Sequence, residues 1–577
     1  MKNLYDYFIK PSTKRQRQYE AVRAFIVDKL SAEQVASKYG YKISTVYTLV
    51  RDVKAGKLDL FPEVKKGPKQ RRLLVSYQQK IVHLRNKNYS VDNIHEELKK
   101  ERILVSTRTI ERILKENGFE KLPRRTDKER GVTKKNKYMP DKSSNLNFIG
   151  LKPFNVDCPV AGLFFFVPYI IESGIIDTVK KCSLPGSKII GNTQASLAML
   201  ALKLIGNERL SQMDSYDHEP GLGIFAGLNV LPKSNYMSTY SCLSSEKMLM
   251  KFQEEIISGL VDKYSILYNG DFVNLDFHSI PHFGDKSEME KVWCGSRNKA
   301  LKGANTVFAQ DAASNMILYT RADILRKEES EEIKKFVGHW KKVKGKVDET
   351  LVFDCKFTKY KILDELTDDN INFITLRQRG KGLVNKALSI AEDKWQKLTL
   401  DIPKRKHKKV LVFEDKVKLR SCSNEFRQVI IKGHGRKNPT FIITNNWNLT
   451  LYKILEVYAK RWRIENKLAE LISFFNLNSL SSPLMIRIHF DILWTMIADT
   501  IYHLFAQDLR RFENIVASSI FKKFINIPGR VIYDGNKFVI KIRKRAYTPI
   551  LKGVEKLSEP FNVPWLDNKP VQIIWTS

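Results

Sequence analysis

The sequence predicts a multidomain α+β protein, with helical units at the N-terminal end, a mixed α/β core and a helical C-terminal part. Three observations lead to this fold class. The length of 577 residues is enough for several domains. Before about residue 265, apolar residues recur every three or four positions, which is the period of helices. After that point, apolar runs typical of strands alternate with helical stretches, which indicates a mixed sheet flanked by helices.

Composition shifts and Pro/Gly breaks divide the chain into eight expected segments. In order, these are a first helical unit (1–62), a basic arm with a second helical unit (63–120), a basic linker (121–145), a helical region (146–265), the first part of the core (266–390), a β-rich insertion (391–448), the second part of the core (449–510) and a C-terminal region with a basic hairpin (511–577).

The net charge of +36 is unevenly distributed along the chain. Residues 1–150 hold 35 Lys and Arg against 17 Asp and Glu, a difference of +18. Such an excess fits a polyanionic partner, either nucleic acid or an anionic membrane surface. The longest apolar run, 161–171, is too short to span a bilayer and is broken by Pro168. The first residues lack the apolar core of a signal peptide, so we expect no membrane association.

The six cysteines lie far apart and form no CxxC pair. This spacing matches neither a disulfide framework nor a zinc site. We therefore expect reduced thiols in a cytoplasm.

Residues 16–53 have the pattern of three short helices. Ser31 can cap the second helix with Gln34 at the capping-box position, and Gly40 can end it. A third helix opening at Ser44 completes a helix-turn-helix pattern. The side chains expected to face a DNA groove are Ser44, Thr45, Tyr47, Thr48 and Arg51.

A similar plan recurs over residues 76–117, where Ser106 opens the last helix and Gly118 follows it as a C′ glycine. Between the units lies a basic arm that suits a minor groove or phosphates. Each unit taken alone fits a plain three-helix bundle equally well. Two units in tandem, joined by a basic arm, favour binding to double-stranded DNA. The expected contacts here are Lys65, Lys66, Arg71, Arg72, Thr107, Arg108 and Arg112.

Two carboxylates follow apolar strand residues in the core. Asp276 comes after VNL and Asp354 after TLVF, so both are expected at strand ends. If the two strands are neighbours, the carboxylates lie close together and need a counter-cation. Hard oxygen ligands suit magnesium or manganese.

A long helix is predicted over 451–475. Its core-facing stripe includes Arg461 and Glu465, while Lys467 falls on the charged outer face. A plain i, i+4 ion pair between Arg461 and Glu465 is one explanation. The alternative is that Glu465 supplies a third oxygen ligand. We then expect two divalent ions, bridged by Asp276, that activate water or a 3′ hydroxyl and stabilise the leaving oxygen of a phosphodiester.

Three stretches together resemble the bacterial insertion-sequence transposases that carry a DDE site on an RNase H-like fold. They are NLDFHSIPHFGD, then LVFDCKFTKYKILDEL with FITLRQRG, and finally ITNNWNLTLYKILEVYAKRWRIE. The last contains the family's Tyr-x2-Arg-x3-Glu signature as Tyr458, Arg461 and Glu465. The likeness covers roughly 266–505 well and 146–265 loosely.

The resemblance implies metal-ligand roles for Asp276, Asp354 and Glu465, with two Mg²⁺ or Mn²⁺ ions. It implies contacts between DNA phosphates and Tyr458 and Arg461. It also implies a β-rich insertion before the catalytic helix, a homodimer in the DNA complex and a nucleoid location in a prokaryotic cytoplasm. One departure is that the family often has Lys seven positions after the Glu, where this chain has Ile472.

Several alternatives stay open. The spacing of 111 positions from the second Asp to the Glu is also compatible with an ordinary extension of the sheet. His278, His282 and Asp285 could form a transition-metal site, although a histidine near a phosphodiester site is more often a phosphate contact or a turn residue. The hairpin predicted over 531–545 has basic residues that suit either DNA backbone or a solvated strand edge. A DNA-binding regulator with an inert core, or a related endonuclease or integrase, would share much of this pattern.

Overall fold

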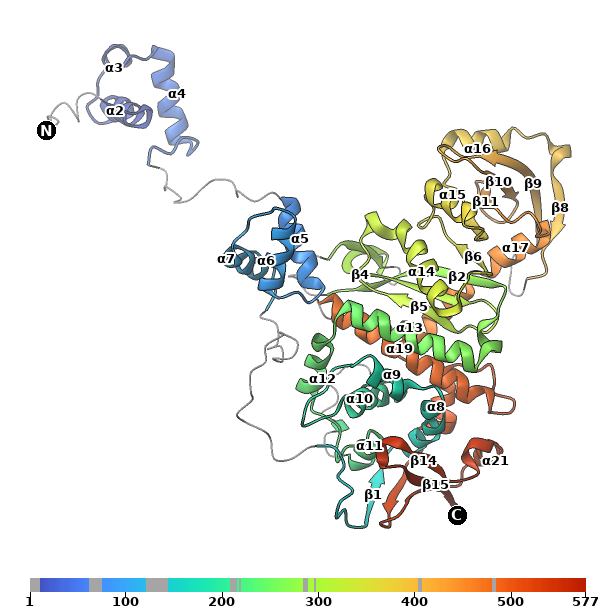
Figure 1. Cartoon of the computed structure of the whole chain (residues 1–577). Helices are drawn as coiled ribbons and strands as arrows, with labels where there is room; N and C mark the ends of the chain where they lie inside the picture. Colours follow the sequence, from blue (N-terminus) through green and yellow to red (C-terminus); the bar gives the residue numbers. More distant parts are fainter. Residues whose placement is uncertain are drawn as a thin grey trace. The chain divides into compact units, whose positions relative to one another are not determined.

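The structure is a computed structural model of the whole chain. It describes residues 11–61, 75–120, 144–207, 215–216, 219–283, 289–294, 297–402, 407–479 and 484–577. The chain divides into two compact units, Met1–Leu74 and Val75–Ser577. Both contain the element types predicted for them, and the mixed α/β, multidomain fold class is confirmed (Figure 1). The predicted arm contacts Lys65, Lys66, Arg71 and Arg72, most of the linker, and Asp285 lie outside the described residues.

Over residues 11–61, the first unit contains three helices, α2 (Lys14–Ile26), α3 (Ala32–Tyr39) and α4 (Ile43–Lys54). The predicted capping box is present, because the Ser31 hydroxyl accepts from the Gln34 amide and the Gln34 side chain accepts from the Ser31 amide. Gly40 ends α3 with a φ of 69°. The predicted opening of the third helix at Ser44 is wrong. The Lys42 carbonyl already accepts from the Val46 amide, so α4 begins before Ser44.

The second helical group contains α5 (Val75–Asn86), α6 (Val91–Lys100) and α7 (Thr107–Glu116). Ser90 and Ser106 cap α6 and α7 as predicted, and Gly118 adopts a φ of 78° after α7. The C-terminal end of α5 contacts the rest of its compact unit, with Lys87 3.5 Å from Glu246 and Asn88 donating to the Cys242 carbonyl.

The core sheet begins with β2 (Phe272–Pro281), β3 (Lys291–Cys294), β4 (Lys299–Asp311), β5 (Ile317–Arg321), β6 (Thr350–Phe353) and β7 (Phe373–Leu376). Strand β4 pairs antiparallel with β2, β3 and β5, whereas β2, β6 and β7 run parallel. Helices α14 (Glu332–Lys344) and α15 (Tyr360–Asp368) connect the later strands. This is the RNase H-like mixed sheet that the resemblance implies. Strand β3 was not predicted, because its four residues, KVWC, are too few to show an alternating pattern.

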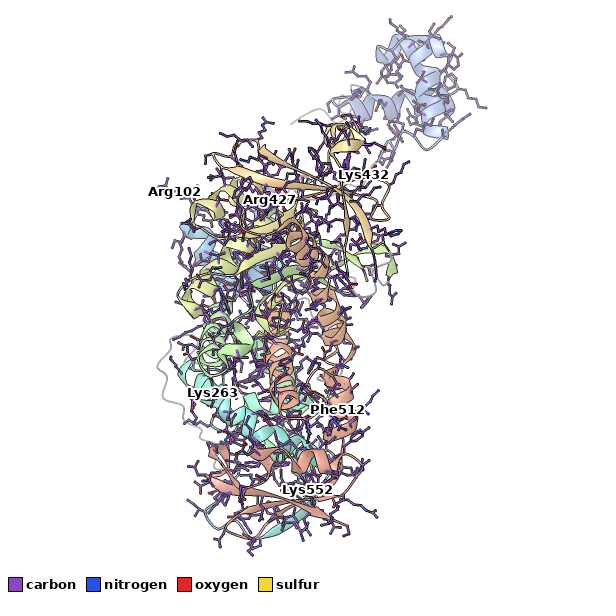
Figure 2. The ribbon with its side chains drawn as sticks, turned by 90° about the vertical axis from the view of Figure 1, so that its right-hand side faces the viewer. Arg102, Lys263, Arg427, Lys432, Phe512 and Lys552 are labelled. Atoms are coloured by element: carbon purple, nitrogen blue, oxygen red, sulfur yellow. The ribbon has the colours of Figure 1, made fainter. Side chains whose placement is uncertain are left out.

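The predicted β-rich insertion continues the same sheet. Its strands are β8 (Gln396–Thr399), β9 (Lys409–Lys418), β10 (Glu425–Lys432) and β11 (Thr440–Thr444), preceded by α16 (Lys381–Leu388). Strand β11 pairs with β7, and β10, β9 and β8 follow in order. The β-rich segment expected before the catalytic helix is therefore present, and it extends the core sheet. Within the second compact unit, Figure 2 shows Arg427 and Lys432 of β10 far from Lys552.

The predicted helical region holds α8 (Val167–Glu172), α9 (Ile175–Lys181), α10 (Asn192–Leu204), α11 (Pro220–Phe225), α12 (Ser234–Tyr240) and α13 (Glu246–Lys263). The helix α19 (Met485–Gln507) packs against α10, α13 and β5. Nearly all of its side chains are buried, including Trp494 and Tyr502. These elements share one large apolar core with β2, β4 and β5.

A second sheet brings distant parts of the chain together. Its order is β1 (Phe154–Cys158), β12 (Gly529–Tyr533), β13 (Phe538–Arg543), β15 (Lys569–Thr576) and β14 (Phe561–Val563). The β12–β13 hairpin with its Asp534–Gly535 turn confirms the prediction. Helices α20 (Ala517–Ile520) and α21 (Thr548–Lys552) flank it in sequence. The prediction of a helical C-terminal part is only partly right, since β1, β14 and β15 depend on pairing that local sequence does not report.

None of the six cysteines, all of which lie within the described ranges, forms a disulfide. Over the described ranges, no single helix is long and apolar enough to cross a membrane. One bent pair, 161–172 with 175–181 at 58°, reaches that length and apolarity only jointly.

Candidate active site

Two predicted carboxylates lie side by side on neighbouring parallel strands. The register pairs Leu275 of β2 with Phe353 of β6, so the next residues on the two strands are Asp276 and Asp354. Asp354 directly follows the last residue of β6, as predicted. Asp276 is the fifth of the ten residues of β2, so the prediction that it ends its strand is wrong; it stands where the pairing of β2 with β6 ends. The structure therefore confirms that the two predicted strands are neighbours.

Asp276 is nearly buried, with a side chain 13% exposed. Its Oδ1 accepts from the Phe277 amide at 2.9 Å, and its Oδ2 accepts from the Arg461 guanidinium at 2.7 Å. Burial by itself would lower the pKa of Arg461, but Asp276 and the neighbouring Tyr458 and Asp354 raise it above its usual value. Arg461 is thus a permanent cation at the carboxylate pair.

Asp354 has a different environment. Its Oδ1 accepts only from the amide of Lys356, at 2.9 Å. Burial raises the pKa of Asp354, and the negative charge of Asp276 raises it further. The carboxylate therefore gains from any additional cation placed between it and Asp276.

The predicted single helix over 451–475 is two helices, α17 (Leu451–Lys460) and α18 (Arg463–Ser473). The buried face continues across this break from Val457 to Ile464 and Leu468, and it leaves Glu465 outside. The Glu465 side chain is 62% exposed, so the prediction that it points inward is wrong. Its Oε1 lies 3.9 Å from the Arg461 guanidinium, a weak version of the i, i+4 pair.

The prediction for Lys467 is wrong as well. It was expected on the charged outer face, but it is buried beside Asp499 of α19, with 2.6 Å between Nζ and Oδ1. Lys467 is three positions after Ile464 and four before Leu471, both buried, so it stands on the apolar face of α18.

Tyr458 lies beside Arg461, whose guanidinium carbon is 5.8 Å from the centre of the phenol ring. Burial raises the pKa of Tyr458 to about 12, so the phenol keeps its proton and can donate a hydrogen bond. The two predicted phosphate contacts are therefore adjacent to each other and to the carboxylate pair.

The residues at the carboxylate pair fit a divalent cation in part. Asp276 and Asp354 supply hard oxygen donors, which suit Mg²⁺ or Mn²⁺. The raised pKa of Asp354 shows that the positive charge near the two carboxylates does not balance their negative charge. However, across the described ranges, no three His, Cys, Asp or Glu side chains come together as a metal site. Glu465 is separated from the pair by the Arg461 side chain, so the third predicted ligand is not in place in this arrangement.

The histidine alternative gains no support from the described residues. The Nε2 of His278 donates to Asn478 Oδ1 at 2.7 Å, which ties β2 to the segment after α18. Burial lowers the pKa values of His278 and His282. His278 therefore has a packing role that explains its position without a metal.

The predicted groove-facing side chains are on exposed surfaces of α4 and α7. Ser44, Tyr47, Thr48 and Arg51 are exposed, and Thr45 is half-buried; Thr107, Arg108 and Arg112 are exposed. The Thr48 hydroxyl donates to the Ser44 carbonyl at 2.9 Å, and Arg51 pairs with Asp52 at 3.1 Å. Their apolar neighbours Val46, Leu49 and Val50 pack inward, as a recognition helix requires.

Residues 270–498 match the family model described as Transposase DDE domain. This segment is a transposase DDE domain. It includes both strand carboxylates, Glu465 and the α17–α18 break, and it agrees closely with the extent expected from the sequence. The chain therefore carries the catalytic domain of a DDE-type transposase.

Solved structures of transposases give weaker likenesses. The piggyBac transposase synaptic complex with hairpin DNA covers 64% of this chain and 81% of its own, at 11% identity and a TM-score of 0.36. The Mos1 transposase paired-end complex covers 63% and 77%, at 12% identity and a TM-score of 0.14. These TM-scores are too low to add to the family match. No curated protein is similar enough to the chain to count as a match.

One buried contact near the site escaped sequence reasoning. Arg427 of β10 pairs with Glu414 at 2.7 Å and donates to the carbonyl of Leu449, just before α17. This contact ties the sheet extension to the start of the helix that leads to Arg461. Its signal in the sequence is an arginine inside an apolar strand, EFRQVIIK, which demands a buried partner.

Proposed function

We propose that the transposase binds the terminal repeats of a mobile DNA element and cuts and rejoins phosphodiesters at the Asp276–Asp354 pair. The observation that carries this proposal is the β2–β6 register, which sets two carboxylates side by side inside the DDE domain. Two paired carboxylates beside a permanent cation suit a reaction at a phosphate, whose charge requires both metal and guanidinium partners.

Arg461 is the first group of the chain expected to move. A guanidinium binds phosphate as well as carboxylate in a two-point geometry. We propose that a DNA phosphate replaces Asp276 as the partner of Arg461. Tyr458, which keeps its proton, then donates a hydrogen bond to the same or the next phosphate.

Withdrawal of Arg461 leaves Asp276 and Asp354 without their main counter-charge and opens the way to Glu465. Asp276 and Asp354 would then hold two Mg²⁺ or Mn²⁺ ions together with Glu465. When bound, such ions lower the pKa of the attacking water or hydroxyl and stabilise the leaving oxygen.

For recognition, we propose that α4 and α7 read the terminal repeats. Both present polar and basic residues over a buried apolar face, and the first 150 residues carry half of the net charge. We also propose a homodimer on DNA, because two element ends must be cut together. We propose a nucleoid location in a prokaryotic cytoplasm, because the substrate is chromosomal DNA.

The test is cleavage of duplexes that carry the inverted repeats flanking the coding region. Asp276→Asn, Asp354→Asn and Glu465→Gln should each abolish Mg²⁺-dependent cleavage while binding of the repeat duplex is retained. Deletion of residues 1–120 should abolish repeat-specific binding. If the wild type binds the repeats but never cuts them with Mg²⁺ or Mn²⁺, the chain is a DNA-binding regulator. Cutting without strand transfer would instead identify an endonuclease.

A further inference from the structure

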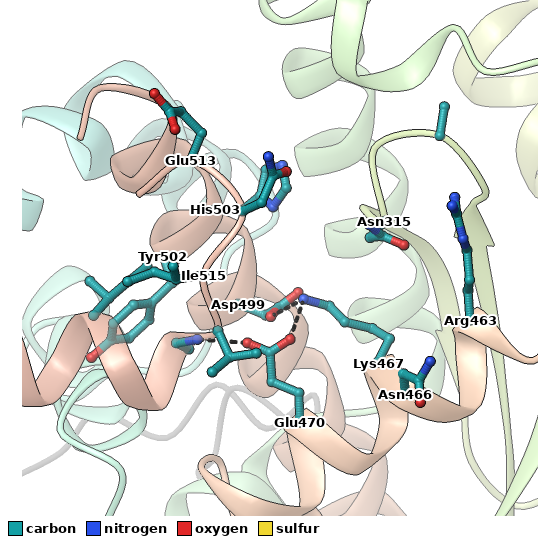
Figure 3. Close-up of a pocket in the computed structure, with 15 residues that line it drawn as sticks. Asn315, Arg463, Asn466, Lys467, Glu470, Asp499, Tyr502, His503, Glu513 and Ile515 are labelled. Carbon is teal, nitrogen blue, oxygen red and sulfur yellow. Dashed lines mark hydrogen bonds and ion pairs between the residues drawn. The ribbon is translucent and has the colours of Figure 1, made fainter. Parts of the chain in front are cut away.

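The helix α18 is attached to the body of the protein by a buried cluster of charges. Lys467 lies between Asp499 of α19, at 2.6 Å, and Glu470 of its own helix, at 3.3 Å (Figure 3). The side chains of Lys467 and Asp499 are only 8% and 4% exposed. Glu470 also accepts from the Ala517 amide at 2.7 Å, which fixes the start of α20. The Lys467 ammonium group thus joins α18 to α19, and the Glu470 carboxylate joins α18 to α20.

This cluster sits on the opposite side of α18 from Glu465. Residues two positions apart in a helix, such as Glu465 and Lys467, point in directions about 200° apart around its axis. The position of Lys467 therefore sets the direction of Glu465. Glu465 has no packed neighbour of its own to set its direction, since its side chain is 62% exposed. The break at Arg461 and Trp462 also separates α18 from α17. The rotation of α18 must therefore be fixed from its buried face.

The other buried residues of α18 are Ile464, Leu468 and Leu471, which form an apolar stripe beside Lys467. An apolar residue at position 467 would complete that stripe and avoid the desolvation of a charge. Hydrogen-bonded charge pairs, in contrast, tolerate little change in angle or distance. Compared with an apolar residue at position 467, the buried ion pair therefore lowers the stability of the protein but gives α18 a defined orientation.

We propose that Lys467 and Asp499 are positioning residues for Glu465: the buried pair fixes the rotation of α18 so that Glu465 faces the Asp276–Asp354 pair once Arg461 withdraws. This proposal rests on the proposed metal site. It assigns a role in catalysis to two residues that touch neither metal nor DNA.

The chain supplies a matched control on the same helix. Lys203 of α10 pairs with Asp491 of α19 at 2.7 Å, with side chains 9% and 11% exposed. Asp491 and Asp499 therefore share helix, partner type and burial, but only Asp499 is tied to the helix that carries Glu465. Asp491→Asn and Asp499→Asn should lower the melting temperature to a similar extent.

The experiment is Fe²⁺-directed cleavage of the full-length polypeptide, bound to repeat duplex, with Fe²⁺ and ascorbate in place of Mg²⁺. Hydroxyl radicals cut the backbone close to the bound ion, so the wild type should give cuts near residues 276, 354 and 465. Asp499→Asn should lose the cut near 465 and keep the other two, whereas Asp491→Asn should keep all three. The Mn²⁺ concentration for half-maximal DNA cleavage should rise about 10-fold in Asp499→Asn alone.

Two further variants guard against misfolding. Lys467→Arg keeps the charge and should retain the cut near 465. The double variant Lys467→Met with Asp499→Leu replaces the pair by apolar side chains, which typically preserves folding, and should still lose that cut. Equal cutting near 465 in Asp499→Asn, the double variant and the wild type would overturn the positioning role. Absence of cuts near all three residues in the wild type would instead overturn the metal site, and the positioning role with it.

Discussion

The strand carboxylates and the helix carboxylate of the candidate site are held in opposite ways. Asp276 and Asp354 are fixed by the register of two buried parallel strands, whose hydrogen bonds allow no rotation. Glu465 is carried by α18, a helix that starts after a break and whose exposed carboxylate has only a distant contact with Arg461. The difference indicates a site in which two ligands are preformed and the third is completed on binding DNA.

The largest expected effect is on cleavage when a strand carboxylate is neutralised. Asp276→Asn and Asp354→Asn should each reduce the cleavage rate by at least about 10³-fold, roughly 4 kcal/mol in activation free energy. Their effects on stability should differ in sign. Asp276→Asn leaves the buried Arg461 without its carboxylate, so the melting temperature falls. Asp354→Asn removes a carboxylate whose ionisation is disfavoured by burial and by Asp276, so the melting temperature stays level or rises.

Cleavage of repeat duplex and thermal unfolding check this prediction, with Glu465→Gln as the comparison. Because Glu465 is exposed, its neutralisation should abolish cleavage with no measurable change in melting temperature. Similar losses of stability in all three variants would show that the strand and helix carboxylates are held alike.

Asp323, a carboxylate shortly after strand β5, tests whether a position after a core strand is enough to make a carboxylate functional. Asp323 follows β5 and lies 3.9 Å from His83 of α5, and its Oδ2 is buried without a hydrogen-bond partner. Burial raises the pKa of Asp323 from 3.8 to about 7, with Lys87 opposing and Glu246 adding to the shift. A raised pKa means that stability is complete below the unfolded value and is lost as pH rises through about 7.

Asp323→Asn should therefore match the wild type in acid and exceed it in stability above neutral pH, by up to roughly 4 kcal/mol. The positive φ of 63° at this position also suits asparagine. Chemical denaturation between pH 5 and pH 8 measures the gap, which should widen with pH, while cleavage of repeat duplex stays unchanged. A gap independent of pH would refute the assignment, and a loss of cleavage would extend the site to β5.

Sequence reasoning predicted the parts of the site that depend on local pattern. The apolar runs before Asp276 and Asp354 identified central strands, whereas their pairing as neighbours was only a condition of the prediction and is supplied by the structure. Ser31, Gln34 and Gly40 defined α3 because capping depends on residues three or four apart. These signals act over a few residues, so one sequence contains them in full.

The errors come from interactions between distant segments. The apolar period runs unchanged through the break after Lys460, and the buried face that it marks includes Lys467 and excludes Glu465. Lys467 is buried only because Asp499, 32 residues later, reaches it. Strand β1 pairs with β12, nearly 400 positions away, and its five residues lie within an otherwise helical stretch. Such partners cannot be predicted from local spacing.

A smaller effect is expected where Arg461 competes with metal for Asp276. Arg461→Gln removes the cation that occupies Oδ2, so the DNA-free protein should bind Mn²⁺ about 10-fold more tightly. Isothermal titration or Mn²⁺ paramagnetic resonance on the full chain measures this directly. Arg463→Gln is the matched control, because Arg463 donates to the Ala312 carbonyl instead of a carboxylate. Equal gains in both variants would mean that general charge, and not the Asp276 contact, limits metal binding.

The smallest effect concerns how the two helices around the break begin. Thr450 caps α17 by accepting from the Lys453 amide at 3.2 Å, whereas Trp462, at the start of α18, offers no side-chain cap. Thr450→Ala should therefore cost about 1 kcal/mol of unfolding free energy. Ser473→Ala is the control, since that hydroxyl only donates to a carbonyl within α18 and satisfies no free amide. Urea denaturation of both variants separates the cases. If Thr450→Ala lowers the unfolding free energy no more than Ser473→Ala, the Thr450 cap contributes nothing measurable to stability. The start of α17 would then be held by the hydrogen bond from Arg427 to the Leu449 carbonyl.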